Sequence, residues 1–366
     1  MVDVVTNHMG YNGCGNCVDY GRLKPFDSRS YFHDFCIIDY NNEDSPSIQV
    51  CWEGDDTVSL PDLRTEDSNV RAIWKDWITQ LISKYSIDGL RIDSTKHIEK
   101  SFHRFFEDAA GVYTIGEVLN GDPYHALDYQ HYMSGVFNYP AFFWMKSAFG
   151  TNRGAGFTDL VNGINNVKAN AVNSSYLGSF SENHDQERWP HITSDRALIK
   201  NVVTLTMMMD GIPVIYQGQE HYYKGDTIEG RAAIWFSNYN TAAELYRWIG
   251  KLNAVRSRAI FKDQNFVSYK AWPIYNGDGS MALRKGFNGN QVVSVFSNRG
   301  SGAGEYWITL LASNTGFSAN QQVVEVLSCG VETVGNDGNH SAKISGGLPR
   351  VYVPLSMLAG SGICSM

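Results

Sequence analysis

Two patterns of apolar residues alternate along the first two thirds of the chain. Short apolar runs predict strands at residues 2–5, 87–92, 112–118, 135–139, 176–180 and 212–216. Longer segments between them carry apolar residues at helical spacing, at 70–85, 158–172, 196–209 and 242–258. Strands that alternate with helices are typical of parallel β/α units. The pattern therefore predicts an α/β fold for residues 1–262.

The pattern changes at about residue 263. From there to residue 366, short runs rich in Val, Ile, Tyr and Thr alternate with turn residues at 276–279, 288–290 and 336–338. Few helical stretches remain, which predicts a separate C-terminal antiparallel β-sandwich domain over 263–366. Residues 9–65 have neither pattern and hold four of the cysteines, so we expect an inserted, loop-rich subdomain there.

Composition narrows the classes of function. Apolar residues make up 43% of the 366 positions and charged residues 19%, enough for a sizeable core and against general disorder. The formal net charge of −8 argues against nucleic acid or an anionic membrane surface as partner. Nothing approaches the run of about 20 apolar residues that a membrane span needs.

Six cysteines favour disulfides and an oxidising compartment, although six allow 15 pairings. They are Cys14, Cys17, Cys36, Cys51, Cys329 and Cys364. Cys14 and Cys17 also have the spacing of redox and metal sites, but no second such pair supports that interpretation. The chain opens directly on a strand-like run without a secretory leader. Either it is an intracellular protein with an unusual start, or an N-terminal part is missing.

Polar residues follow the predicted strands at the points where these end. Asn7 and His8 follow the first strand, Asp93 and Glu117 follow the next two, and Asp185 follows the run at 176–180. Any one of them could be only a turn or cap residue. In a β/α barrel, however, the carboxyl ends of the strands converge on one face that holds the active site. We therefore expect the three acids to share a pocket.

Clustered carboxylates suit the cleavage of glycosidic bonds. Acidic groups that repel one another raise at least one pKa, and an acid beside an ionised carboxylate can protonate a leaving oxygen while its neighbour attacks. Arg91 lies two residues before Asp93, on the same side of the strand, and can keep Asp93 ionised and oriented. A purely structural ion pair is the alternative for Arg91.

These segments resemble the four conserved regions of the α-amylase family of glycoside hydrolases. The matching stretches are residues 3–8, 89–97, 116–119 and 180–185, in the family's order and spacing. Residues 58–63, 210–213, 217–220 and 346–350 are similar to the secreted fungal members, and the likeness covers essentially the whole chain. The resemblance implies a (β/α)8 TIM-type barrel with a C-terminal β domain.

The resemblance also implies roles for individual residues. Asp93 would be the nucleophile of a retaining mechanism, Glu117 the general acid/base, and Asp185 the stabiliser of the transition state, acting on α-1,4-glucans. The implied contacts to sugar are His8, Arg91, Lys96, His97, Gly121, His184 and Arg231. Glu187-Arg-Trp189 replaces a proline-bearing family segment, which would alter sugar contacts beside the cleavage point.

A structural calcium ion and two disulfides complete the family's pattern. The side chains of Asn7 and Asp62 and the backbone carbonyl of His97 match calcium ligands, and oxygen ligands are what Ca²⁺ prefers. Gln49 stands where fungal members carry an acidic ligand. The family disulfides match Cys36–Cys51 and Cys329–Cys364. Cys14 and Cys17 have no counterpart, and a bond between them is a hypothesis.

Two departures shape the functional prediction. The family barrel has eight strands and we count six, so we expect the first two βα units, with the secretion signal, to precede Met1 in an extracellular, monomeric parent. Hydrolysis is favoured over a fungal 4-α-glucanotransferase activity because His8, which that group often alters, is intact. A non-catalytic protein that only binds α-glucan is the third interpretation.

Overall fold

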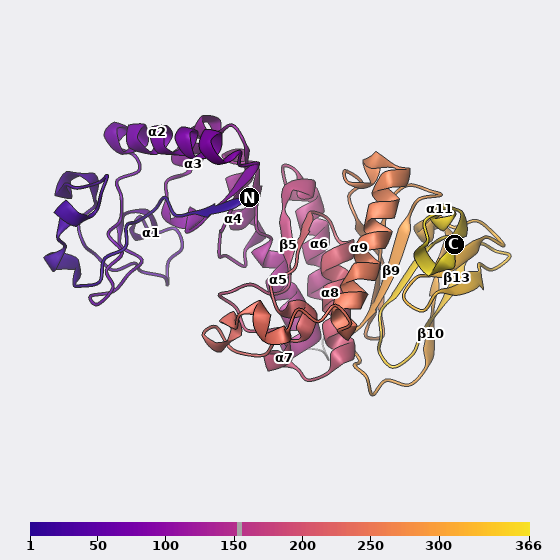
Figure 1. Cartoon of the computed structure of the whole chain (residues 1–366). Helices are drawn as coiled ribbons and strands as arrows, with labels where there is room; N and C mark the ends of the chain where they lie inside the picture. Colours follow the sequence, from indigo (N-terminus) through magenta and orange to yellow (C-terminus); the bar gives the residue numbers. More distant parts are fainter. Residues whose placement is uncertain (152–155) are drawn as a thin grey trace. The chain divides into compact units, whose positions relative to one another are not determined.

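The computed structural model describes residues 1–151 and 156–366. These residues divide into two compact units, residues 1–137 and residues 138–366 (Figure 1). The predicted boundaries of the catalytic domain (1–262), the insertion (9–65) and the C-terminal domain (263–366) stay predictions.

A four-stranded parallel sheet organises residues 1–137. Its strands are β1 (Val2–Val4), β2 (Gly89–Ile92), β3 (Tyr113–Gly116) and β4 (Gly135–Val136), in that spatial order. The connections contain α2 (Ser68–Tyr85), α3 (Lys100–Ala110) and α4 (Pro123–Asp128). The predicted parallel β/α pattern is confirmed here. The predicted strand at 135–139 is shorter than expected, because Asn138 caps the next helix through a bond from the Ala141 N–H.

Helix α2 shows why the sequence folds as it does locally. Asp67 accepts a bond from the Asn69 N–H at the first turn, and Ser86 ends the helix in the left-handed conformation. Val70, Trp74 and Ile78 recur every four residues and are buried. The apolar face continues over Ile73, Trp77 and Leu81, which line an apolar groove of about 400 Å³ beside β1.

The segment between β1 and α2 consists of loops with short helical turns, as expected. The turns are η1 (Gly15–Cys17), η2 (Tyr20–Arg22), η3 (Arg29–Tyr31) and α1 (Ser47–Val50). The isolated bridge His8↔Asp62 joins its far end to the residues that follow β1, and Phe32↔Leu63 joins two parts of the segment. Its own core contains fully buried Phe26, Phe32 and Trp52.

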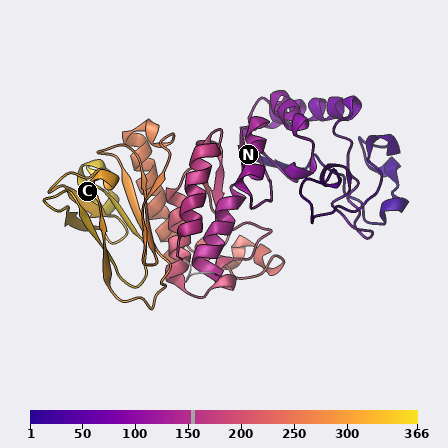
Figure 2. The ribbon, with the colours of Figure 1, turned by 180° about the vertical axis from the view of Figure 1, so that it is seen from behind.

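Residues 138–262 contain two more parallel strands and a layer of helices. Strands β5 (Gly178–Phe180) and β6 (Ile212–Val214) pair with each other. The helices are α5 (Tyr139–Lys146), α6 (Thr158–Asn170), α7 (Trp189–Ile192), α8 (Arg196–Met208) and α9 (Glu244–Lys262). Helix α8 is buried at nearly every position because it lies between β5, β6 and the C-terminal strands (Figure 2).

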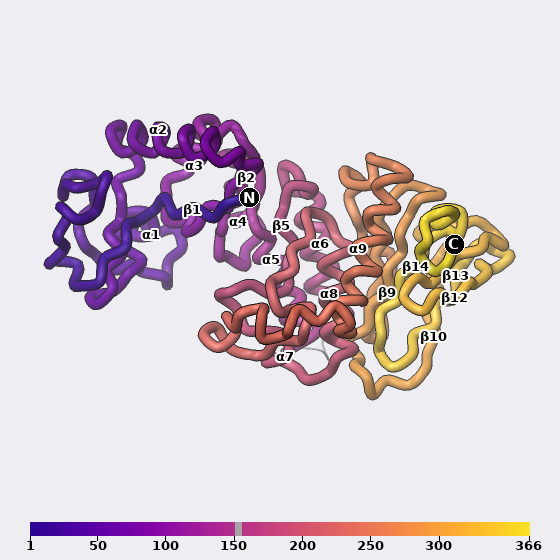
Figure 3. Tube along the Cα trace, viewed as in Figure 1, coloured from indigo at the N-terminus to yellow at the C-terminus, as the bar shows by residue number. Residues whose placement is uncertain are grey.

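The C-terminal strands form the predicted antiparallel domain. Six of them make one sheet in the order β12-β11-β14-β9-β8-β7, and two make the pair β10-β13 (Figure 3). Their bounds are β7 Trp272–Gly277, β8 Ser280–Lys285, β9 Val292–Ser297, β10 Tyr306–Leu310, β11 Gln322–Glu325, β12 Gly330–Thr333, β13 His340–Ile344 and β14 Arg350–Pro354; short helices α10 (Ala312–Thr315) and α11 (Leu355–Leu358) follow β10 and β14. One face of the larger sheet packs on α8 and α9 and the other on β10 and β13, so β8 and β9 are buried throughout.

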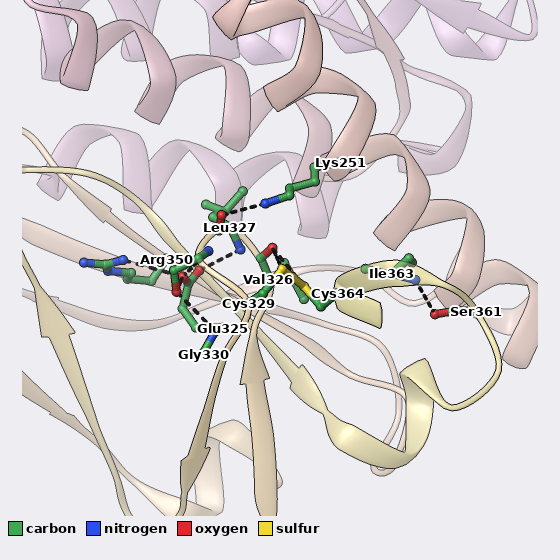
Figure 4. The surroundings of a disulfide bond; sticks show 11 residues. Lys251, Glu325, Val326, Leu327, Cys329, Gly330, Arg350, Ser361, Ile363 and Cys364 are labelled. Carbon is green, nitrogen blue, oxygen red and sulfur yellow. Dashed lines mark hydrogen bonds and ion pairs between the residues drawn. A yellow bond between two sulfur atoms is a disulfide. The ribbon is translucent and has the colours of Figure 1, made fainter. Parts of the chain in front are cut away.

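The six cysteines form three disulfides. Cys36–Cys51 and Cys329–Cys364 are the pairs that the resemblance implied, and Cys14 is bonded to Cys17. Cys329–Cys364 joins the β11–β12 turn to the end of the chain (Figure 4). Beside it, Lys251 of α9 donates to the Leu327 carbonyl at 2.8 Å, which fixes the same turn to the helix layer. In the part of the chain that the structure describes, no helix is long and apolar enough to cross a membrane.

Candidate active site

Asp93 and Glu117 lie side by side because of the strand register. Ile92 pairs with Gly116 across β2 and β3, and each acid is the next residue along its own strand. The Glu117 N–H donates to the Ile92 carbonyl at 2.9 Å, and the Asp93 N–H to the Val4 carbonyl at 2.9 Å. The parallel ladder therefore continues past the strand ends and delivers both carboxylates to the same edge.

Ser94 joins the two carboxylates. It adopts the left-handed conformation, with φ 51° and ψ 34°, which is uncommon for a residue other than glycine. Its N–H donates to Glu117 Oε2 at 3.0 Å and its hydroxyl to Asp93 Oδ2 at 3.0 Å. An unusual backbone conformation thus serves to hold both acids.

Gly116 is required by a close approach just before Glu117. A Cβ at this position would lie 2.7 Å from the Met133 sulfur and 2.8 Å from the Thr95 hydroxyl. Both neighbours are buried, so a side chain here would displace the end of β3. The glycine in the family-like stretch 116–119 is therefore explained by packing.

Arg91 supplies the positive charge for this pair. Its guanidinium, 12% exposed, contacts the carboxylates of Asp93, of Glu117 at 3.4 Å and of Asp3 at 2.9 Å. Burial disfavours the charged form, but these carboxylates outweigh it and raise the pKa of Arg91 above its ordinary value. The predicted role of Arg91, to hold Asp93 ionised and oriented, fits this arrangement.

Glu53 connects two of the predicted sugar-binding histidines. Its carboxylate lies 3.3 Å from His8 Nδ1 and 3.3 Å from His97 Nε2, and it accepts a bond from Asn7 Nδ2 at 3.0 Å. Burial opposes its ionisation, yet these contacts and one from Ser94 lower the pKa of Glu53 to about 2. Burial lowers the pKa of His97, although the negative charge of Glu53 acts in the opposite direction.

Lys96 and Gly121 are the remaining predicted sugar contacts in residues 1–137. Lys96 is buried, with its ammonium 3.2 Å from Glu43 and 5.6 Å from the centre of the Tyr40 ring. Gly121 is exposed in the loop between β3 and α4. Lys96 and His97 follow Ser94 directly in the turn η4 (Thr95–His97), so they share the Asp93 strand end.

The four predicted calcium ligands come from four segments, which contact one another in pairs. Asn7 and Asp62 are neighbours because His8 bridges to Asp62 and the Leu63 N–H donates to the Asn7 carbonyl at 2.8 Å. His97 Nδ1 lies 2.9 Å from the Ile48 carbonyl, next to half-buried Gln49. Among the described residues, no group of three or more His, Cys, Asp or Glu could hold a metal ion.

Asp62 shows that an oxygen-ligated cation fits this place. The residue is fully buried; Oδ2 lies 2.6 Å from His33 Nδ1, and Oδ1 has no hydrogen-bond partner. Burial raises the pKa of Asp62 to about 7. An orphaned buried carboxylate oxygen next to an amide is the kind of donor set that Ca²⁺ accepts, so the residues fit the ion.

Residues 138–366 hold the third predicted acid. Asp185 follows β5, and its carboxylate lies 3.2 Å from His184 Nε2 and accepts a bond from Arg231 Nη2 at 2.8 Å. Arg231 Nε also donates to the His184 carbonyl at 3.0 Å. The three predicted residues of this unit are therefore in contact, and all three side chains are at least 32% exposed.

The segment that departs from the family pattern follows Asp185 directly. Glu187 pairs with Lys146 of α5 at 2.8 Å. Arg188 and Trp189 are fully buried, and both bind the carboxylate of Glu182, Arg188 through Nη1 at 2.8 Å and Trp189 through its N–H at 2.8 Å. That this segment alters sugar contacts stays a prediction.

Sequence reasoning missed three contributors. Ser94 stands beside Asp93 in a recognised motif, but only its backbone conformation reveals its two bonds. Glu53 lies in a loop, 40 residues from Asp93, without a periodic signal. Arg188 lies next to Glu187 in the departing segment, and nothing in the sequence there signals that it is fully buried.

Family models and known proteins match this chain over its whole length. The family described as "Alpha amylase, catalytic domain" matches residues 1–272, and "Alpha-amylase, domain C" matches residues 273–366. "Alpha-amylase 2" of Schwanniomyces occidentalis is 46% identical over 100% of this chain and 71% of its own length. "Alpha-amylase" of Saccharomycopsis fibuligera is 41% identical over 100% of this chain and 72% of its own length.

Solved structures share the fold of this chain. The α-amylase of Malbranchea cinnamomea superposes with a TM-score of 0.95 at 42% identity, covering 100% of this chain and 76% of that one. An Anoxybacillus α-amylase shares the fold with a TM-score of 0.80 at 21% identity, over 96% of this chain and 75% of that one.

Proposed function

Because this chain belongs to the α-amylase family, we propose that it is an α-amylase that hydrolyses internal α-1,4-glucosidic bonds of starch- and glycogen-type glucans. The observation that carries the proposal is the adjacent pair Asp93 and Glu117, held by Ser94 and Arg91. Two fixed carboxylates are the equipment of a retaining glycosidase. The fungal relatives, 41–46% identical along the whole chain, support the same activity.

Asp93 and Glu117 divide the chemistry between them. Asp93 attacks the anomeric carbon, the bond to the leaving oxygen breaks, and Glu117 gives that oxygen its proton. Glu117 then takes a proton from water, which attacks the same carbon and releases Asp93. Arg91 and the Ser94 hydroxyl hold the Asp93 carboxylate in a fixed orientation, which supports its role as nucleophile.

The remaining predicted residues act on the sugar. Asp185 is the third carboxylate, which favours the positive charge that develops on the sugar ring. Two alternatives, a 4-α-glucanotransferase and a non-catalytic glucan-binding chain, are outcomes of the test described below. The sugar hydroxyls are bound by the residues that match the family's sugar contacts. These binding residues are His8, Arg91, Lys96, His97, Gly121, His184 and Arg231.

Calcium is part of the proposal. The side chains of Asn7, Asp62 and Gln49 and the backbone carbonyl of His97 would hold it. When bound, Ca²⁺ supplies a fixed positive charge that neutralises Asp62 and ties the loop segment to the strand ends. Glu53 already accepts from Asn7 Nδ2, which leaves the amide oxygen of Asn7 as the group that can face the ion.

We also propose an extracellular, monomeric enzyme. The six cysteines, all bonded in pairs, support an oxidising compartment because cytosolic proteins rarely keep disulfides.

The products formed from maltopentaose test the function. We expect the purified chain to release shorter malto-oligosaccharides, and Asp93→Asn to lower the rate by about four orders of magnitude while leaving oligosaccharide binding intact. Asp3→Asn is the matched control, because Asp3 touches the same Arg91 but is 62% exposed. Oligomers longer than the input would identify a glucanotransferase, and binding without any conversion would identify a non-catalytic protein.

A further inference from the structure

A buried ion pair lies beside the Asp185 group and has no part in the chemistry described above. Arg188 Nη1 donates to Glu182 Oε2 at 2.8 Å, and the two side chains are 0% and 1% exposed. A buried pair is tolerated only where additional hydrogen bonds satisfy the remaining donors and acceptors. The other partners of Arg188 therefore indicate what the pair holds together.

Besides Glu182, Arg188 binds two separate segments of residues 138–366, the loop 225–230 and the segment at Gln217. Its Nε donates to the Gly230 carbonyl at 2.8 Å, its Nη2 to the Gln217 carbonyl at 2.7 Å, and its backbone N–H to the Gly225 carbonyl at 3.1 Å. The guanidinium also lies 4.0 Å from the centre of the Tyr216 ring. One side chain thus fixes the loop 225–230 against the segments that follow β5 and β6.

That loop leads directly to Arg231, which binds Asp185 and His184. The Arg231 side chain is 56% exposed, so packing does little to fix its position. Its backbone, in contrast, follows Gly230, which is buried and whose Cβ, if present, would lie 3.3 Å from Arg188 Cγ. The place of Arg231 is therefore set by the loop that Arg188 holds.

We propose that Arg188 is a positioning residue, which clamps the loop 225–230 and so sets the guanidinium of Arg231 against the carboxylate of Asp185. The inference rests on the proposed function, because it assigns Asp185 a role in glucan cleavage. A residue that served only stability would affect folding but would not depend on Arg231.

A double-mutant cycle distinguishes the two roles. Arg188→Lys keeps the charge and the backbone N–H bond to Gly225, but its single ammonium cannot reach the Gly230 and Gln217 carbonyls and Glu182 together. We expect it to lower kcat on a chromogenic malto-oligosaccharide by about tenfold in the native chain, and by less than about twofold when Arg231 is already Ala. Equal losses in both backgrounds would overturn the proposal.

Arg256→Lys is the matched control. Arg256 is also buried and donates to three backbone carbonyls, those of Met207, Met209 and Gly211, but its contacts do not include the loop 225–230. We expect it to lower the melting temperature without changing kcat. Should Arg188→Lys fail to fold, Glu182→Gln takes its place, since it keeps the shape and removes the charge that anchors Arg188.

Hydrogen exchange separates this inference from the proposed function. The N–H groups of Ile228, Glu229 and Gly230 all donate to Asp226 within the loop. We expect Arg188→Lys, and not Arg256→Lys, to speed their exchange. A native chain that cleaves no glucan would refute the function and leave this readout intact, whereas unchanged exchange in Arg188→Lys would refute the clamp.

Discussion

The carboxylates of the two units are held in opposite ways. Asp93 and Glu117 project from adjacent strands, and their arginine, Arg91, is itself on β2 and 12% exposed. Asp185 follows β5, but its arginine, Arg231, comes from a loop and is 56% exposed. The first pair is fixed by the sheet register, and the second contact is fixed through a loop and the buried Arg188.

This difference gives the more rigid arrangement to Asp93 and Glu117, the residues proposed to make and break bonds. A largely buried charge pair is screened less by solvent than an exposed one, so Arg91 interacts more strongly with its neighbours than Arg231 does with Asp185. An exposed pair such as Arg231 and Asp185 contributes less and weakens in salt. The contacts of Asp93 therefore suit the fixed chemistry proposed for it, whereas the contact at Asp185 is the one that can yield to a bound sugar in the proposed function.

The largest expected difference between the two arginines is in the loss of activity when each is replaced by lysine. Lysine keeps the charge but loses the planar fork that reaches two carboxylates at once. We expect Arg91→Lys to lower kcat by about a hundredfold and Arg231→Lys by about threefold, measured on the same malto-oligosaccharide.

Salt concentration sharpens the same test. The activity of Arg231→Lys should converge on that of the native chain as ionic strength rises, because the exposed contact is then screened in both. The deficit of Arg91→Lys should persist. Equal deficits for the two variants would show that burial is not what distinguishes the two arginines.

Substitution of Ser94 is a second test of how Asp93 and Glu117 are held. Ser94→Ala removes the hydroxyl bond to Asp93 and keeps the N–H bond to Glu117, so we expect kcat to fall by about tenfold. Ser86 is the control, since it has the same left-handed conformation at the end of α2, with φ 50°. Ser86→Ala should change the melting temperature by a similar amount and leave kcat unchanged.

Replacement by glycine separates conformation from chemistry. Glycine adopts φ > 0 without steric cost, so Ser94→Gly and Ser86→Gly should both hold or raise the melting temperature. Only the variant at position 94 should lose activity. Full activity in Ser94→Gly would mean that the hydroxyl bond to Asp93 has no catalytic value.

The sequence predicted the features of the fold that follow from hydrophobic periodicity and the candidate residues that lie in short motifs. The six parallel strands, the helix α2 and the antiparallel C-terminal domain follow from apolar spacing, which burial enforces. Helices α3 and α5 were not predicted. In α5, the apolar run 139–145 lacks a polar face because the helix is mostly buried.

The sequence did not predict the contacts between residues that are far apart along the chain. Glu53 reaches His8, 45 positions away, and Arg188 reaches Gly230, 42 positions away, only after the loops have folded. Neither position carries a local signal, since a charged residue in a loop is expected to be solvated. Motifs identified Asp93, Glu117 and Arg91, but not the two bonds by which Ser94 joins the acids.

The smallest expected effect concerns Asp62 and the way in which the stability of residues 1–137 depends on calcium and on pH. Without the ion, the folded chain binds a proton at Asp62 with a pKa of about 7, against 3.8 in an unperturbed aspartate. Because its pKa is raised in the folded chain, Asp62 contributes most to the free energy of unfolding below about pH 4, and this contribution falls as the pH rises toward 7. His33 acts with the same sign: burial lowers its pKa, but Asp62 outweighs this and raises it.

Calcium should remove that dependence, because the ion binds the deprotonated carboxylate. In chelator we expect the melting temperature to fall by about 5 °C between pH 5 and pH 7.5, and in saturating calcium we expect no fall. Asp62→Asn should lose both the pH effect and the response to calcium, whereas Asp44→Asn, at an exposed position, should keep them. A native chain whose melting temperature ignores calcium at pH 7.5 would remove Asp62 from the ligand set. The strand ends of its unit would then depend on hydrogen bonds alone.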